Sequence, residues 1–191
     1  MSFEARFERE PRSGDDLFGV ALDRLADAKL RVETGELSYG GVLKAAHDNK
    51  VLHEEHLQVF LAGELDRDSR RQYSVHREVE VRHRKEPDIR IAQGGVDGAV
   101  SIEVKVADSW TLPQLRRALS EQLVGRYLGS PQSGHGVLLL GYFGKSYWCT
   151  EGRKGRNSFR QVIELLQEDS STLKELRPEI EGLAVVGIDF T

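Results

Sequence analysis

The chain has 191 residues, a formal net charge of −4 and 30% charged residues, a composition typical of a folded protein rather than a disordered one. The length suits one domain with a small addition. No apolar run approaches the roughly 20 residues of a membrane-spanning helix, and the polar N-terminus does not resemble a secretory signal peptide. We therefore expect a cytoplasmic protein with no membrane partner.

The single cysteine, Cys149, excludes an internal disulfide and a four-cysteine zinc or iron–sulfur site. No base is adjacent to it in sequence, so we expect a buried small apolar residue rather than a nucleophile. Charge is unevenly distributed, because residues 1–69 are net acidic whereas residues 70–130 are net basic. A polyanion responds to such a local field more than to the overall charge.

The first half of the chain changes from helical to alternating periodicity. Apolar residues at helical spacing predict a helix over residues 15–31, with Ser13 as its N-cap, and a second helix over residues 51–65. Alternation then predicts strands over residues 73–82, 88–91 and 100–106, the last two joined by a turn at residues 93–98.

The second half predicts a helix over residues 112–128, a strand over 136–141, a helix over 159–167 and a strand over 183–188. The run at 136–141 is apolar throughout, which is typical of a strand buried on both faces. This order predicts an α/β fold with a mixed central sheet flanked by helices.

Three charged residues of the predicted strands carry the chemistry. Glu103 and Lys105 are two residues apart on one strand, so both side chains project from the same face. If this strand pairs with the one that Asp88 begins, Asp88 lies beside Glu103. Two carboxylates there suit a hard divalent cation such as Mg²⁺. Lys105 beside the cation would neutralise a phosphate and orient water.

The spacing of Glu86-Pro87-Asp88, fourteen intervening residues and Glu103-Val104-Lys105 resembles the signature of the PD-(D/E)xK phosphodiesterase superfamily, which includes restriction endonucleases. The resemblance implies a restriction-endonuclease-like core in residues 51–191, preceded by an N-terminal helical extension, residues 1–50. It implies that Asp88, Glu103 and the Val104 carbonyl bind Mg²⁺, with Mn²⁺ as a substitute, and that Lys105 is the catalytic lysine.

Members of the superfamily often add a glutamate from the preceding helix. Glu54 and Glu55 are the candidates here, followed by Glu64, and we favour Glu55 as the additional metal ligand. Some members also carry a glutamine followed four residues later by a tyrosine. Gln122 is present as a candidate catalytic residue, but Tyr127 is five residues on.

Several signals have plain alternatives. Pro-Asp pairs are common at turns and Glu-x-Lys on exposed strands. His53 and His56 lack an evident third ligand and are interpreted as surface residues. Trp110, Tyr147 and Trp148 could stack on bases, although packing is the safer interpretation. The basic loop 152–156 suits either a phosphate contact or a solvated turn.

We expect a metal-dependent nuclease that acts on nucleic acid, with DNA as the favoured substrate. We expect it to serve as an effector of bacterial antiviral defence. The alternative is a catalytically idle module that binds nucleic acid or a protein partner. A homo-oligomer and an attached sensor or NTPase domain in a larger protein are the other expected partners. Candidate backbone contacts, which add affinity without sequence specificity, are Arg77, Arg82, Arg84, Lys85, Arg116, Arg117 and Arg126.

Overall fold

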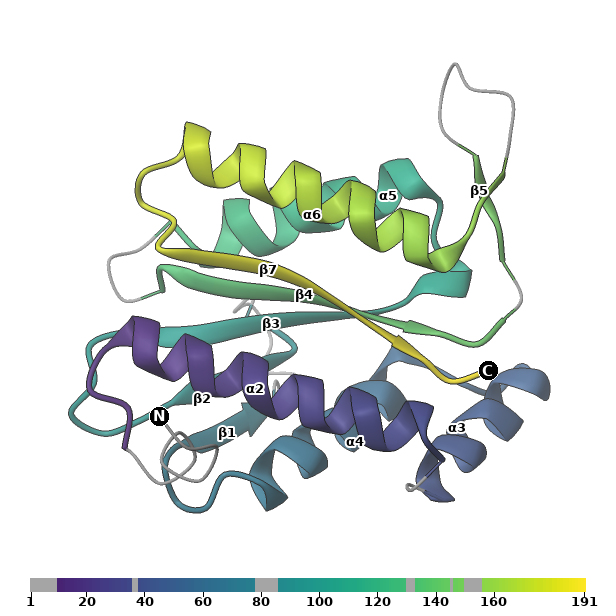
Figure 1. Ribbon diagram of the computed structural model, residues 1–191, viewed down its shortest axis with the longest axis horizontal. Helices are drawn as coiled ribbons and strands as arrows, with labels where there is room; N and C mark the ends of the chain where they lie inside the picture. Colours follow the sequence, from purple (N-terminus) through teal and green to yellow (C-terminus); the bar gives the residue numbers. More distant parts are fainter. Residues whose placement is uncertain (1–9, 36–37, 78–85, 130–132, 145, 150–155) are drawn as a thin grey trace.

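The computed structural model describes residues 10–35, 38–77, 86–129, 133–144, 146–149 and 156–191. A five-stranded mixed sheet, flanked by helices on both faces, forms its centre (Figure 1). This confirms the predicted α/β class with a mixed central sheet. None of the helices in the described ranges has both the length and the apolar character needed to cross a membrane.

The sheet has the strand order β1-β2-β3-β4-β7. β1–β2 and β2–β3 are antiparallel, whereas β3–β4 and β4–β7 are parallel. The strands are Ser74–Arg77 (β1), Ile89–Ala92 (β2), Ala99–Val106 (β3), His135–Tyr142 (β4) and Gly182–Asp189 (β7). A separate two-stranded ribbon pairs Trp148–Cys149 (β5) with Arg156–Asn157 (β6).

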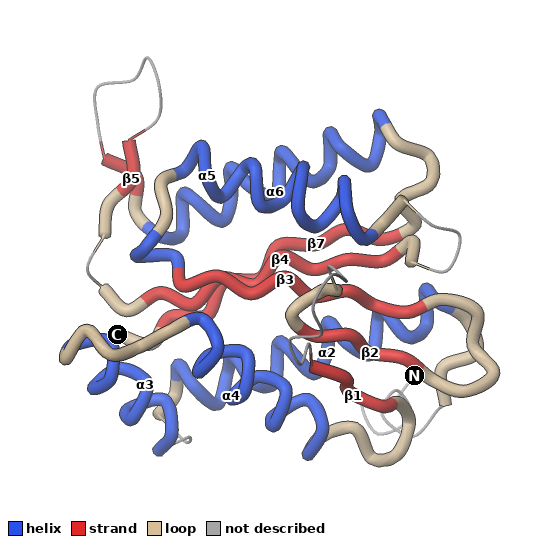
Figure 2. Tube along the Cα trace, turned by 180° about the vertical axis from the view of Figure 1, so that it is seen from behind, coloured by secondary structure: helices blue, strands red, loops and turns tan. Residues whose placement is uncertain are grey.

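The helices lie in two layers (Figures 1 and 2). One layer contains Gly14–Glu33 (α2), Ser38–Asp48 (α3) and Glu54–Arg67 (α4). The other contains Leu112–Arg117 (α5), Ala118–Tyr127 (η2) and Phe159–Leu176 (α6). A short 3₁₀ turn, Ala107–Ser109 (η1), follows β3 directly.

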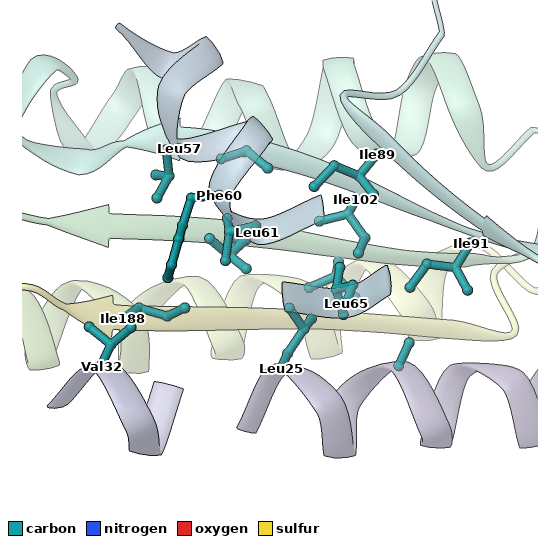
Figure 3. Close-up of a cluster of buried hydrophobic side chains, with 14 of the residues drawn as sticks. Leu25, Val32, Leu57, Phe60, Leu61, Leu65, Ile89, Ile91, Ile102 and Ile188 are labelled. Atoms are coloured by element: carbon teal, nitrogen blue, oxygen red, sulfur yellow. The ribbon is translucent and has the colours of Figure 1, made fainter. Parts of the chain in front are cut away.

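Each face of the sheet has its own hydrophobic core. Ile102 of β3 packs with Leu25 of α2 and Leu61 of α4, as Figure 3 shows. On the opposite face Leu138 of β4 packs with Leu119 of η2. The apolar even-numbered residues of β3 all enter the first core, so Ser101, Glu103 and Lys105 are directed to the other face, since side chains alternate along a strand.

α2 is integrated into the first core. The Ser13 side chain accepts a hydrogen bond from the Asp16 N–H, as predicted for an N-cap. Leu17, Ala21 and Leu25 are fully buried against the sheet and α4. Residues 14–33, which we expected within an extension outside the core, therefore supply one wall of it.

The helix predicted over residues 112–128 is present, but most of it is not α-helical. After α5 the backbone changes to π-helical hydrogen bonding over the ten residues of η2. At this junction the Ser120 hydroxyl donates to the Arg116 carbonyl, at 2.9 Å. A side chain that competes for a helix carbonyl favours such a departure from regular α-helical pairing.

Other expectations differ in detail. Cys149 is exposed, so the prediction of a buried cysteine is wrong: β5 belongs to the small ribbon rather than to the central sheet. The strand predicted over 73–82 is described only to Arg77, and residues 78–85 lie outside the described ranges. α6 continues to Leu176, beyond the predicted end at residue 167.

Candidate active site

Asp88 and Glu103 lie opposite each other where the β2–β3 ladder ends. Ile89 pairs with Ile102, and continuing this antiparallel register by one residue places Asp88 across from Glu103. The Val104 backbone N–H donates a 2.7 Å hydrogen bond to Asp88 Oδ2. Pro87 precedes Asp88, and proline has no N–H to extend the ladder, so the strand pairing gives way to a side-chain contact here.

Lys105 connects the carboxylates of the site. Its Nζ lies 2.9 Å from Glu103 Oε1 and 4.0 Å from Asp88 Oδ2. It also donates to Glu54 Oε2 on α4, at 3.2 Å. The Glu103 and Lys105 side chains are only 6% and 7% exposed, so these charges interact in a poorly solvated environment. The three residues on which the sequence prediction depends therefore converge.

The electrostatics reflect this crowding. Burial and the neighbouring carboxylate of Glu103 raise the pKa of Asp88 to about 7, against the opposing influence of the Val104 N–H and Lys105. Burial would lower the pKa of Lys105, but the carboxylates of Glu103 and Glu54, with Asp88, outweigh it and raise that pKa above its usual value. The ammonium charge is thus held in place by the surrounding acids.

The glutamate that α4 brings to the site is Glu54 rather than Glu55. The Glu55 side chain is 73% exposed and lies 3.7 Å from Arg77. Glu64 forms ion pairs with Arg31 and Arg67 at the other end of the helix. Glu54 is in the first turn of α4, which places it beside Lys105 at the end of β3. Adjacent residues on a helix do not share a face, so only one of the pair can do this.

Trp110 is also part of the site, although the sequence analysis favoured packing for it over a functional contact. Its indole Nε1 donates a 2.6 Å hydrogen bond to Glu54 Oε1, and Lys105 Nζ lies 5.3 Å from its ring centroid. Trp110 follows η1, so the short turn after β3 carries the ring back over Lys105. The only signal in the sequence was its position five residues after Lys105.

η2 brings Tyr127 close to the carboxylates. Burial, then the charges of Glu103 and Asp88, raise the pKa of the Tyr127 hydroxyl to about 12. Five-residue hydrogen bonding widens each turn, which rotates residue i+5 towards the face of residue i. The five-residue spacing from Gln122 to Tyr127 is therefore compatible with one helix face here, although an α-helix would separate them.

Gln122 itself lines a small surface cavity of about 240 Å³ beside Trp110. The other residues around this cavity are Gln114, Arg117 and Glu121. Trp110 thus contacts both the cavity and the Lys105 ammonium. Gln122 therefore shares this cavity with Trp110, and it forms no hydrogen bond or ion pair with Asp88 or Glu103 among the described residues.

The oxygen donors of the site suit Mg²⁺. Glu103 Oε2 is buried and has no hydrogen-bond partner among the described residues. Such an orphaned anionic oxygen beside Asp88 fits a hard cation, which prefers oxygen ligands and retains waters. Within the described ranges, no cluster of three or more histidine, cysteine, aspartate or glutamate side chains is arranged to hold a metal. The residues fit a site with two carboxylate ligands.

Other candidates have partners elsewhere or lie outside the described residues. Arg116 is paired with Asp169 on α6, at 2.8 Å. Arg82, Arg84 and Lys85 lie outside the described residues, as does the loop 152–156 except for Arg156, which lies over the Tyr147 ring. His53 and His56 are exposed, as expected, and the His56 ring accepts from the His53 N–H at the start of α4.

Comparisons of the chain with protein-family models, with curated proteins and with solved structures give no match.

Proposed function

We propose that the protein is a metal-dependent nuclease that hydrolyses phosphodiester bonds at Asp88, Glu103 and Lys105. The observation that carries the proposal is the convergence of two carboxylates and one ammonium around the orphaned Glu103 Oε2. The order helix, three antiparallel strands, helix and parallel strand also agrees with the core that the PD-(D/E)xK resemblance implies.

Asp88 and Glu103 are the proposed metal ligands, assisted by the Val104 carbonyl. When bound, Mg²⁺ would supply positive charge for the phosphate oxygens and lower the pKa of a coordinated water. Asp88 is oriented for this role by the Val104 N–H, which fixes one of its oxygens. Glu103 is oriented by Lys105, which binds Oε1 and leaves Oε2 available.

Lys105 is the proposed catalytic lysine. An ammonium at this position neutralises charge on the phosphate and orients the attacking water. Glu54 holds Lys105 from the side of α4, and Trp110 holds Glu54 in turn. This pair keeps the lysine protonated and directed at the site, so we propose that the α4 glutamate at the site is Glu54 and that it positions Lys105, in place of Glu55 as an additional metal ligand.

DNA is the proposed substrate. The basic residues of the middle of the chain support contacts to a phosphate backbone, and no element is typical of a base-reading motif, so weak sequence preference is expected. Action as a cytoplasmic effector of antiviral defence, as a homo-oligomer and beside a sensor or NTPase domain, stays a prediction from the resemblance.

A catalytically idle module is the second candidate, and one observation favours it. Lys105 already pairs with Asp88, Glu103 and Glu54, so each carboxylate has a cationic partner without a metal ion. Such a module would bind nucleic acid or a protein partner and leave the phosphodiester bond intact.

Cleavage of supercoiled plasmid, single-stranded DNA and RNA in Mg²⁺ or Mn²⁺ separates the two candidates. The wild type is compared with Asp88→Asn and Lys105→Ala, with Glu55→Gln as the matched control. The proposal predicts cleavage by the wild type and control and loss of at least about 100-fold in the other two. Equal cleavage by all four proteins would remove the site from the mechanism, and binding without cleavage would favour the idle module.

A further inference from the structure

A cavity lies away from Lys105, along the outer edge of the sheet. It has a volume of about 900 Å³, and its floor is β7. α2 forms one wall and α6 the other, and Figure 1 shows β7 running between these two helices. β7 is the last strand in the order of the five-stranded sheet, so its outer edge has no neighbouring strand among the described residues.

The backbone groups on this edge are bonded to side chains at every second residue. Lys29 Nζ donates to the Gly187 carbonyl, at 2.6 Å, and Gln167 approaches the Val185 carbonyl at 3.4 Å. Glu33 Oε1 accepts from the Asp189 N–H, at 3.1 Å. These are the groups that a further β-strand would use, since N–H and C=O of alternate residues point to the same side.

The groove has an apolar wall on each face of the sheet beside the edge of β7. Leu22 and Ala26 of α2 line one side, and Phe159 and Ile163 of α6 line the other. An added strand directs successive side chains to opposite faces of the sheet. Both sets of side chains would therefore meet apolar surface.

Charges at the rim leave a net acidic end. Lys29 is paired with Glu33, and Arg160 with Glu164, so these four residues largely cancel. Asp189 lines the same groove, and its carboxylate accepts from the Thr191 N–H without a cation among its described partners. A segment that binds here is favoured by a basic residue near Asp189.

We propose that this groove binds an extended segment of a partner protein, which adds to β7 as a sixth strand. The segment is apolar on both faces and basic at the end that meets Asp189. The long side chains of Lys29, Gln167 and Glu33 satisfy the edge when the groove is empty and move aside for the incoming backbone. Backbone hydrogen bonds supply affinity and the apolar walls supply specificity, as in other cases of strand addition.

The test uses the full chain and a fluorescein-labelled octapeptide in which valine and alanine alternate after an N-terminal lysine, so that both faces of the added strand are apolar. Fluorescence anisotropy measures binding, and amide hydrogen exchange measured by NMR monitors Val185 and Gly187. A second peptide carries N-methyl groups on alternate residues, which removes its hydrogen-bond donors but keeps its side chains. Ala26→Arg on α2 blocks the groove, and Val42→Arg on α3, an exposed position outside it, is the matched control.

We expect saturable binding of the first peptide, slower exchange at both amides, and at least tenfold weaker binding of the N-methylated peptide. Ala26→Arg should weaken binding tenfold, whereas Val42→Arg should leave it unchanged. Equal binding of both peptides would overturn the proposal in favour of a site for small apolar molecules. No saturable binding, or a stable homodimer in light scattering that Ala26→Arg dissociates, would also overturn it.

Discussion

The carboxylate of Asp88 accepts a 2.7 Å hydrogen bond from the backbone N–H of Val104, the residue between Glu103 and Lys105. This one bond joins the two halves of the predicted motif across fourteen intervening residues. It also explains why the strand pairing ends where it does, since Asp88 replaces a ladder partner with its own side chain.

Glu54 and Glu55 offer a matched test within one helix turn. Glu54→Gln removes the charge that holds Lys105 and weakens the contact to Trp110, so cleavage should fall by about 10- to 100-fold. Glu55→Gln should change cleavage less than twofold, because its side chain is mostly exposed. Initial rates on plasmid DNA measure both. A larger loss for Glu55→Gln than for Glu54→Gln would contradict the assignment.

Lys105→Met should destabilise the metal-free protein. Removal of the ammonium leaves Asp88, Glu103 and Glu54 as close carboxylates in a poorly solvated site, which costs on the order of 3 kcal/mol. Urea unfolding in EDTA measures this loss. Added Mn²⁺ should restore part of the stability of the variant, because a cation again compensates the carboxylates. Equal stability of the two proteins in EDTA would contradict the described network.

Asp88 gives a pH dependence with a definite sign. Its pKa is about 7 in the folded protein and near 4 when unfolded, so the folded state binds more protons between these values. The contribution of Asp88 to stability is therefore fully present below about pH 4 and is lost as pH rises through 7. Asp88→Asn removes this loss and should be more stable than wild type at pH 8, by on the order of 2 kcal/mol.

Thermal unfolding of the wild type and Asp88→Asn in EDTA at pH 5 and pH 8 measures this difference in stability. In a chain of this size each kcal/mol shifts the melting temperature by about 2–4 °C. The advantage of Asp88→Asn should shrink at pH 5. An advantage that grows as the pH falls would show that the carboxylate is stabilised, rather than crowded, in the folded protein.

Leu25 tests whether α2 belongs to the core. Leu25→Ala should lower the free energy of unfolding by about 2–5 kcal/mol, since the side chain is fully buried between the sheet and α4. Leu30→Ala, on the same helix but 61% exposed, should cost less than about 0.5 kcal/mol. Urea unfolding compares the two. Small effects from both would indicate that α2 is a loosely attached extension.

Periodicity predicted most of the fold because local and global preferences agree in the strands. The even-numbered apolar residues of β3 all enter one core, which is what their alternation indicated. The position of α2 could not be predicted from the sequence. An amphipathic pattern shows that a helix buries one face, but it does not show which surface covers that face. The π-helical turns of η2 escaped prediction because their i, i+5 pairing depends on competition at single carbonyls.

For the site, strand parity and the turn at 93–98 were sufficient to bring Asp88, Glu103 and Lys105 together. The sequence could not decide between Glu54 and Glu55, because the choice depends on the rotation of α4 about its own axis. Tertiary packing determines that rotation. The contacts of Trp110 with Glu54 and Lys105 could not be predicted for a related reason: only the course of η1 after β3 directs its ring over Lys105.

The central claim is that Asp88 and Glu103 together hold a divalent cation. Calorimetric titration of the metal-free protein with Mn²⁺ tests it most directly, with Glu103→Gln and Asp88→Asn compared against Glu55→Gln. The account predicts one Mn²⁺ per chain for the wild type and for Glu55→Gln, and affinity at least tenfold weaker in each of the other two variants. Unchanged Mn²⁺ affinity in Glu103→Gln and Asp88→Asn, or no binding by the wild type, would contradict it.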